Sequence, residues 1–272
     1  MNVLFFELAM TAYLISAVLF LVYLPGGARR PSLLAAALGG TLAGFVFHTA
    51  AITVRWRELG GFPATNPWET ASLFSWMLVV AFLLFDFRFR IHVLGSFAVP
   101  LAFLSVFAAA LLRGVSTPID PTLQGLGLAL HTSLMVMGSV AFCISFLVGI
   151  MYVIQMRLLK SKHLGPLYQQ LPSLEQCDRL IAKGILVGFP LTTLGLISGA
   201  IGAFYAWGSY WDWTPKQTIS LLVWGFYLTM LLGRYLFGVR AQRGAYLAIF
   251  GFVAVLLSFL GADVLLGESQ HF

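Results

Sequence analysis

Tryptophans and histidines are the residues of this chain whose types and spacing point to a chemistry. Trp207, Trp211 and Trp213 fall within seven residues, with Tyr210 between them. Flat aromatic side chains packed this densely suit a large planar ligand or the aromatic belt of a membrane interface. Five histidines supply the neutral nitrogen donors that haem iron and other metals accept. The elements that carry these residues therefore decide which chemistry is open to the chain.

The composition places them in a membrane protein. The 272 residues are 60% hydrophobic and only 10% charged, with a mean hydropathy of +0.91, whereas soluble domains are about 25% charged. Runs of about 20 apolar residues predict eight spans, at 3–24, 33–54, 69–86, 91–112, 124–156, 181–206, 219–239 and 245–267. We expect an all-α polytopic bundle of about eight transmembrane helices, forming one integral membrane domain over residues 1–272.

Basic residues set the expected orientation of this bundle in the lipid bilayer. Twelve of the 16 Lys and Arg side chains fall in alternate connections, which the positive-inside rule assigns to the cytoplasm. Both termini and the loop 207–218 then face outward, and residues 157–180 form a cytoplasmic juxtamembrane connection. The expected location is the bacterial inner (cytoplasmic) membrane, crossed many times. The net charge of +6 is on this interpretation a topology signal and does not indicate nucleic acid binding.

Three histidines lie toward the outside. His131 opens the fifth span at its outer end, and His271 follows the last span. His48 lies inside the second span, about 9 Å below its outer end; an ionisable group there indicates a functional site, with a buried imidazole bonded to a neighbouring helix as the alternative. Another helix or a ligand could approach closely along the face that follows His131, which carries Met135, Gly138, Phe142, Ser145 and Gly149.

The spacing of the histidines and the placement of the tryptophans favour a site at the outer surface. Successive histidines are 44, 39, 32 and 108 residues apart, unlike the paired histidines, about two heptads apart, of b-type cytochromes. Any axial pair would have to come from different segments that meet outside. All seven tryptophans fall in outer connections or the outer halves of spans. Interfacial anchoring explains single members of this set, and a functional outer surface explains its one-sidedness.

The segment 207–218 resembles the outward WGxYWxWDPKET-like segment of the cytochrome c assembly membrane proteins, the CcsA/ResC/CcmC/CcmF group. The residues that coincide in order are Trp207, Gly208, Tyr210, Trp211, Trp213, Pro215, Lys216 and Thr218. The stretch 61–70 resembles the loop ahead of the third span in the same family. The resemblance extends from about residue 40 to the end of the chain.

This resemblance implies a membrane haem-handling protein of cytochrome c maturation, which binds haem b non-covalently and presents it at the outer membrane face. It implies a haem surface made of Trp207, Tyr210, Trp211 and Trp213. His131 and His271 would be the axial iron ligands, and His48 the intramembrane histidine. The implied partners are apocytochrome c and a CcsB/ResB-type membrane protein. Any activity would belong to a haem lyase (cytochrome c synthetase) complex and not to a stand-alone enzyme.

The chain also departs from the family pattern. Thr214 and Gln217 stand where the family has acidic residues, and Leu232 stands where CcsA-type members carry a second intramembrane histidine. Chain length and the segment 171–180 resemble the compact HemX-like branch, which acts in haem biosynthesis by controlling glutamyl-tRNA reductase. That role is the alternative function. A secondary transporter ranks third, because polar residues inside the predicted spans are sparse.

Overall fold

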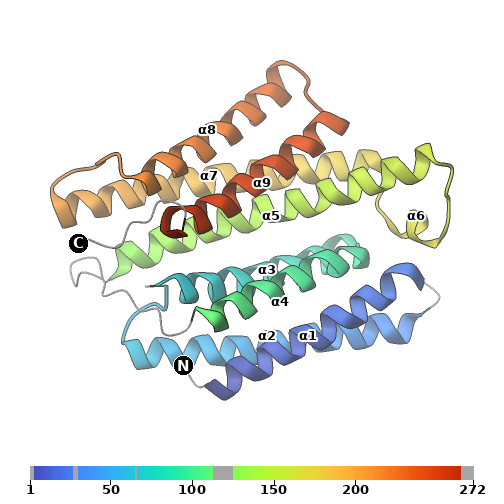
Figure 1. Cartoon of the computed structure of the whole chain (residues 1–272), viewed down its shortest axis with the longest axis horizontal. Helices are drawn as coiled ribbons and strands as arrows, with labels where there is room; N and C mark the ends of the chain where they lie inside the picture. Colours follow the sequence, from blue (N-terminus) through green and yellow to red (C-terminus); the bar gives the residue numbers. More distant parts are fainter. Residues whose placement is uncertain (1–2, 27–29, 65, 113–124, 265–272) are drawn as a thin grey trace.

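The computed structural model describes residues 3–26, 30–64, 66–112 and 125–264, and the regular structure of this part is helical (Figure 1). The elements are, in chain order, α1 (Val3–Gly26), α2 (Pro31–Leu59), α3 (Pro67–Phe89), η2 (His92–Leu94), α4 (Gly95–Leu111), α5 (Leu126–Lys160), α6 (Pro166–Gln170), α7 (Leu174–Trp207), α8 (Pro215–Leu236) and α9 (Ala241–Val264). A polytopic helical bundle is thereby confirmed.

Each of the eight predicted spans coincides with a helix. Within the described residues, seven helices are long and apolar enough to cross a membrane; the fourth of these combines η2 and α4 as His92–Leu111. The eighth, α9 (Ala241–Val264), is apolar over Ala241–Leu257, the part whose side chains the structure describes. The loop predicted at 207–218 is non-helical only from 208 to 214, because Trp207 ends α7 and Pro215 begins α8.

Polar caps and glycines explain where several helices begin and end. Asn66 precedes α3 and accepts a hydrogen bond from the Glu69 backbone N–H at 3.0 Å, followed by Pro67 in the first helical position. Gly60 after α2 and Gly208 after α7 have φ of 63° and 77°. Both adopt the left-handed conformation that ends helices and that glycine takes without steric cost.

The long helices form two groups of four. In the first group α1 packs on α2 and α4, and α3 packs on α4; in the second, α5 packs on α7 and α9, and α8 packs on α9. The groups join where α3 and α4 meet α5, and Figure 1 shows them one above the other. Because the helices alternate in direction, the C-terminal ends of α2, α4 and α7 and the N-terminal ends of α3, α5 and α8 share one end, at the left of Figure 1. We refer to it as the outer end, following the positive-inside prediction.

The packing of α5 confirms the predicted close approach along its small-residue face. A Cβ on Gly138 would lie 3.1 Å from the Gly188 carbonyl oxygen of α7. Further along the same face, Gly149 comes equally close to the backbone of α9 at Ala245. Small residues at such positions let helix backbones approach within van der Waals contact inside a membrane. The tight α5–α7 pair is the frame on which the candidate site is built.

Candidate functional site

The loop between α7 and α8 has a defined hydrogen-bonded conformation. Thr214 is the N-cap of α8, and its hydroxyl accepts a hydrogen bond from the Gln217 backbone N–H at 3.3 Å. The Gln217 side chain reaches back, and its Oε1 accepts from the Asp212 backbone N–H at 2.9 Å. Trp213 between them has a positive φ of 54°. Thr214 and Gln217, which replace acidic residues of the family pattern, thus close the loop with neutral groups.

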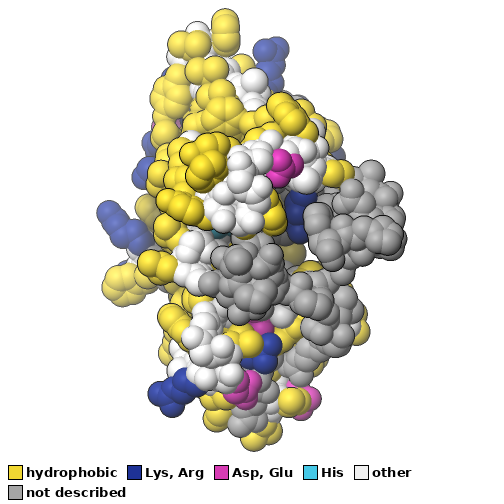
Figure 2. Space-filling model, turned by 90° about the vertical axis from the view of Figure 1, so that its left-hand side faces the viewer, with side chains coloured by type: hydrophobic (Ala, Val, Ile, Leu, Met, Phe, Trp, Pro, Cys, Tyr) yellow, Lys and Arg dark blue, Asp and Glu magenta, His cyan; other side chains and the backbone are white. Residues whose placement is uncertain are grey.

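The aromatic side chains of this loop make ring contacts, yet Trp207, Tyr210 and Trp213 stay more than half exposed. Tyr210 stacks on Phe204 of α7, with ring centroids 4.4 Å apart and planes inclined by 11°. Trp211 meets Trp213 edge to face at 6.1 Å. Trp213 is nevertheless 70% exposed, and Trp207 is 55% exposed. Figure 2 looks onto the outer end, where hydrophobic side chains gather over the upper part, on the side of α7 and α8. The loop therefore presents flat apolar surface outward.

His131 lies one turn into α5 and is held against α7. Its Nδ1 atom lies 2.7 Å from the Gly195 carbonyl oxygen. Because a carbonyl oxygen can only accept, Nδ1 carries the hydrogen and donates it, which leaves the lone pair of the neutral ring on Nε2. A histidine that ligates a metal usually has its other ring nitrogen fixed in this way. The half-buried His131 ring is thus oriented as a nitrogen donor.

Gly199 brings the His131 ring close to the loop. A Cβ at Gly199 would lie 2.7 Å from Cε1 and Nδ1 of the imidazole, so only glycine leaves room for it. Gly199 precedes Trp207 by eight residues, or about 12 Å of helix. Lys216 lies in the first turn of α8, directly after the loop. His131 and the tryptophan loop are therefore brought to the same end of the second helix group.

His48 occupies a different place. It is fully buried in the first helix group, where its Nε2 lies 2.9 Å from the Ser72 hydroxyl of α3. Phe6 and Tyr13 of α1 contact the ring edge to face, at centroid distances of 6.0 and 5.8 Å. Its Nδ1 has no hydrogen-bond partner among the described residues. The described contacts of His48 are thus with α1 and α3, and they link it neither to His131 nor to the loop.

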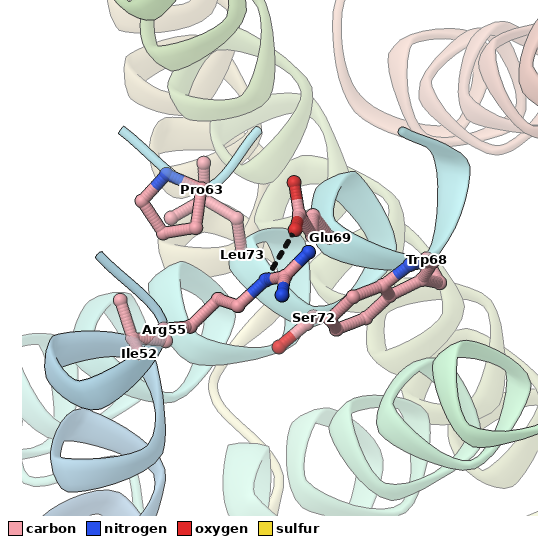
Figure 3. Close-up of a pocket in the computed structure, with 7 residues that line it drawn as sticks. All are labelled: Ile52, Arg55, Pro63, Trp68, Glu69, Ser72 and Leu73. Carbon is pink, nitrogen blue, oxygen red and sulfur yellow. Dashed lines mark hydrogen bonds and ion pairs between the residues drawn. The ribbon is translucent and has the colours of Figure 1, made fainter. Parts of the chain in front are cut away.

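A small cavity lies at the outer end between α2 and α3 (Figure 3). Arg55 and Glu69 face each other across it, with Nε and Oε1 2.8 Å apart. The Arg55 guanidinium also lies over the Trp68 ring, 5.2 Å from its centroid. The cavity volume of about 10 Å³ is enough for about one water molecule. The Arg55 guanidinium is therefore held by Glu69 and Trp68. The cavity is too small for a planar cofactor.

His271 and position 232 also bear on which residues could ligate haem iron together with His131. His271 lies outside the described residues, so its pairing with His131 stays a prediction. Within the described residues, no three histidine, cysteine or carboxylate side chains gather as a metal site. Leu232 is 44% exposed on α8, whereas His48 is buried in the other helix group. The described part of the chain therefore offers His131 as its one imidazole beside the loop.

Comparison with known proteins identifies the family. A family model described as Cytochrome C assembly protein matches residues 64–268, which include α3 to α9 and the loop. The chain belongs to this family. Among curated relatives, the cytochrome c biogenesis protein CcsA of Guillardia theta is 30% identical over 252 residues, covering 86% of this chain and 83% of that protein. CcsA of Microcystis aeruginosa is 29% identical, covering 96% and 94%. The predicted family resemblance is confirmed.

A solved structure supports the fold. The chain is similar to Cytochrome c Heme Lyase CcmF with a TM-score of 0.61 and 17% identity, covering 95% of this chain and 49% of that one. This chain thus spans about half the length of that protein. It is a multi-pass membrane protein of cytochrome c maturation. The relatives favour this role over the HemX-like alternative, and the bacterial inner membrane stays a prediction.

Sequence reasoning missed two features that shape the site. Gly195 supplies the carbonyl acceptor for His131, and Gly199 supplies the space for its ring. Their spacing of four residues, which places them on one face of α7, was the signal available. A third feature that the sequence did not predict is the hydrogen bond from the Asp212 N–H to the Gln217 side chain. The position of Gln217, three residues after Thr214, has the spacing of a capping box, but its side chain accepts from a residue two positions before the cap.

Proposed function

We propose that the chain binds haem b non-covalently at the outer end of its second helix group and presents it for attachment to apocytochrome c. The observation that carries this proposal is the His131 imidazole, whose Nδ1 donates to Gly195 and whose Nε2 is left as a donor atom. The residues fit the group, because one oriented nitrogen and the exposed rings of Trp207 and Trp213 lie at the same end. His271 would supply the second iron ligand.

The aromatic loop would bind the porphyrin by apolar contact. Tryptophan rings bury large flat areas, and each well-packed aromatic pair contributes about 0.5–1.5 kcal/mol beyond area burial. Fixed loop hydrogen bonds from Gln217 and Thr214 hold these rings in place before a ligand arrives. Haem supplies the vinyl groups to which cytochrome thiols attach; the chain's own residues bind and orient. A CcsB/ResB-type membrane protein would complete a haem lyase complex.

The test is the visible spectrum of the full chain purified in detergent. Wild type should carry haem with a low-spin spectrum, which His131→Ala and His271→Ala should lose. His131→Gly should regain it when free imidazole is added, because the small ligand can fill the space of the lost ring. His163→Ala is the matched control, since that exposed histidine lies after α5 at the opposite end of the bundle. A haem-free wild type, or an unchanged spectrum in His131→Ala, refutes the proposal.

A further inference from the structure

The N-terminal ends of α3 in the first helix group and α8 in the second have the same residue pattern and hydrogen bonds. Asn66 before α3 and Thr214 before α8 are both N-caps followed by proline. Four residues after each cap, a threonine hydroxyl donates back to the cap carbonyl: Thr70 to Asn66 at 3.1 Å, and Thr218 to Thr214 at 3.0 Å. Residues of α3 and α8 thus correspond with an offset of 148.

The first two helices of each group repeat in the same manner. Ser16 of α1 donates to the Ala37 carbonyl of α2 at 2.6 Å, and Ser145 of α5 donates to the Ile181 carbonyl of α7 at 3.2 Å. Three residues before each serine, an aromatic ring packs against a glycine of the partner helix, in the pairs Tyr13 with Gly44 and Phe142 with Gly188. The groups are two copies of one four-helix unit, in the same orientation.

A tryptophan brace is part of this repeated unit. In the first group Trp76 of α3 donates its indole N–H to the Thr49 hydroxyl at 2.9 Å and stacks on Phe45 at 5.7 Å. In the second, Trp224 of α8 donates to Thr193 at 2.8 Å and stacks on Phe189 at 5.4 Å. Each tryptophan follows its N-cap by ten residues, and each threonine follows its phenylalanine by four.

The brace in the second group differs from that in the first because its threonine lies beside the residue that holds His131. Thr193 is two residues from Gly195, whose carbonyl accepts the hydrogen bond of His131. One short stretch of α7 therefore carries both the hydrogen-bond acceptor of the His131 imidazole and the hydroxyl that anchors α8. α8 is less buried than α3. Its buried residues are Tyr227 and Met230, whereas α3 has nine buried residues. The position of α8 should accordingly depend strongly on single contacts such as the Trp224 brace.

We propose that Trp224 is a positioning residue for the site: by fixing α8 to α7 beside Gly195, it sets where the loop and Lys216 stand relative to His131. Lys216 precedes Trp224 by eight residues, or about 12 Å of helix, so a small rotation of α8 at the brace displaces the loop. The stack of Trp224 on Phe189 and its hydrogen bond to Thr193 fix both the rotation of α8 about its axis and its position along α7. The effect of Trp224 on haem binding rests on the proposed function, whereas its effect on the position of α8 does not.

The experiment compares matched substitutions in the two braces. Trp224→Phe and Trp76→Phe each keep a stacking ring and remove the indole donor. Thr193→Val leaves the Trp224 donor without its acceptor, and Thr193→Ser restores the acceptor. Haem titration of the full chain gives the first readout. The second needs no haem: spin labels at Leu194 and Leu222, both more than half exposed on α7 and α8, report the distance between the helices.

Trp224→Phe and Thr193→Val should broaden or shift the label distance and weaken haem binding roughly three- to tenfold, the range expected for one lost hydrogen bond. Trp76→Phe and Thr193→Ser should leave both readouts at the wild-type value. An unchanged distance in Trp224→Phe, or equal loss of haem binding in Trp76→Phe, overturns the inference. If wild type binds no haem, the proposed function fails on its own, and the distance alone decides whether Trp224 sets the position of α8.

Discussion

Substitution of Gly199 by alanine tests the geometry of the His131 site most directly. The added Cβ would lie 2.7 Å from the imidazole, whereas ordinary contacts begin at 3.4 Å, so the ring must withdraw by about 0.7 Å. Gly195 and Gly199 are one turn apart on the same face of α7. Withdrawal straight away from α7 therefore also lengthens the Nδ1 to Gly195 oxygen distance from 2.7 Å to about 3.4 Å, beyond the normal range of such bonds.

The expected result is a loss of binding without a loss of stability. The broken hydrogen bond costs about 1 kcal/mol, and replacing glycine by alanine inside a helix gains about 1 kcal/mol, so the free energy of unfolding should change little. The haem affinity should fall roughly 10- to 100-fold, as it does when a group that orients a metal ligand is lost. A decrease of this size with normal unfolding separates misplacement of His131 from general damage.

Gly202→Ala is the matched control on the same helix, because a Cβ built there meets no described atom within 4 Å apart from its chain neighbours and its own helix backbone. It should gain about 1 kcal/mol of stability and keep the wild-type spectrum. Haem titration and thermal unfolding of both variants in detergent give the comparison. If Gly199→Ala binds haem as tightly as Gly202→Ala, the contact between His131 and α7 does not orient the ligand, and the reasoning is refuted.

Two further predictions concern stability. Arg234→Ala should cost about 3 kcal/mol of unfolding free energy, because it leaves the largely buried Asp178 carboxylate without its two-bond partner; Arg179→Ala, whose ion pair with Glu175 is exposed, should cost less than about 1 kcal/mol. Equal losses in SDS unfolding curves would contradict this difference. Gly60→Ala should cost about 1 kcal/mol, since its φ of 63° strains an L side chain even in open space; Gly60→Asn should cost less, and a thermal melt that ranks them otherwise counts against the cap assignment.

The number and order of the helices were predictable because membrane insertion constrains every span in the same way. A run of about 20 apolar residues has few alternatives to a helix in hydrocarbon, and each predicted span coincides with one. The helix ends were less predictable. α7 begins at Leu174, seven residues before the predicted span, because Ser173 caps it and its first two turns are polar. Hydropathy does not report such extensions outside the membrane, whereas capping residues do.

The site was predictable in its residue types but not in its partners. The tryptophan loop and His131 stood out by composition and position, and the structure places them at one end. The spacing of Gly195 and Gly199 indicates a small-residue face on α7, but it does not say which side chain packs there or that the Gly195 carbonyl is its acceptor. The separation of His48 from the loop likewise depends on which helices pair. That choice is made by side-chain packing between distant segments.

The repeated unit shows why the second helix group holds a candidate ligand site at its outer end and the first helix group does not. Gly44 and Gly188 set an offset of 144 between α2 and α7, so Arg55 corresponds to Gly199. With the offset of 148, Glu69 of α3 corresponds to Gln217 of α8. In the first group these positions form an ion pair 2.8 Å long that leaves room for about one water molecule.

In the second group the same positions form no ion pair, because glycine carries no side chain and the glutamine turns back to accept from the Asp212 N–H. The space beside Gly199 is filled instead by the imidazole of His131. Replacing a charged pair by a glycine and a neutral amide thus removes the groups that close the first unit. It admits a nitrogen donor at the point where the second unit carries its tryptophan loop. The scaffold is shared by both units, and the proposed chemistry depends on these two substitutions.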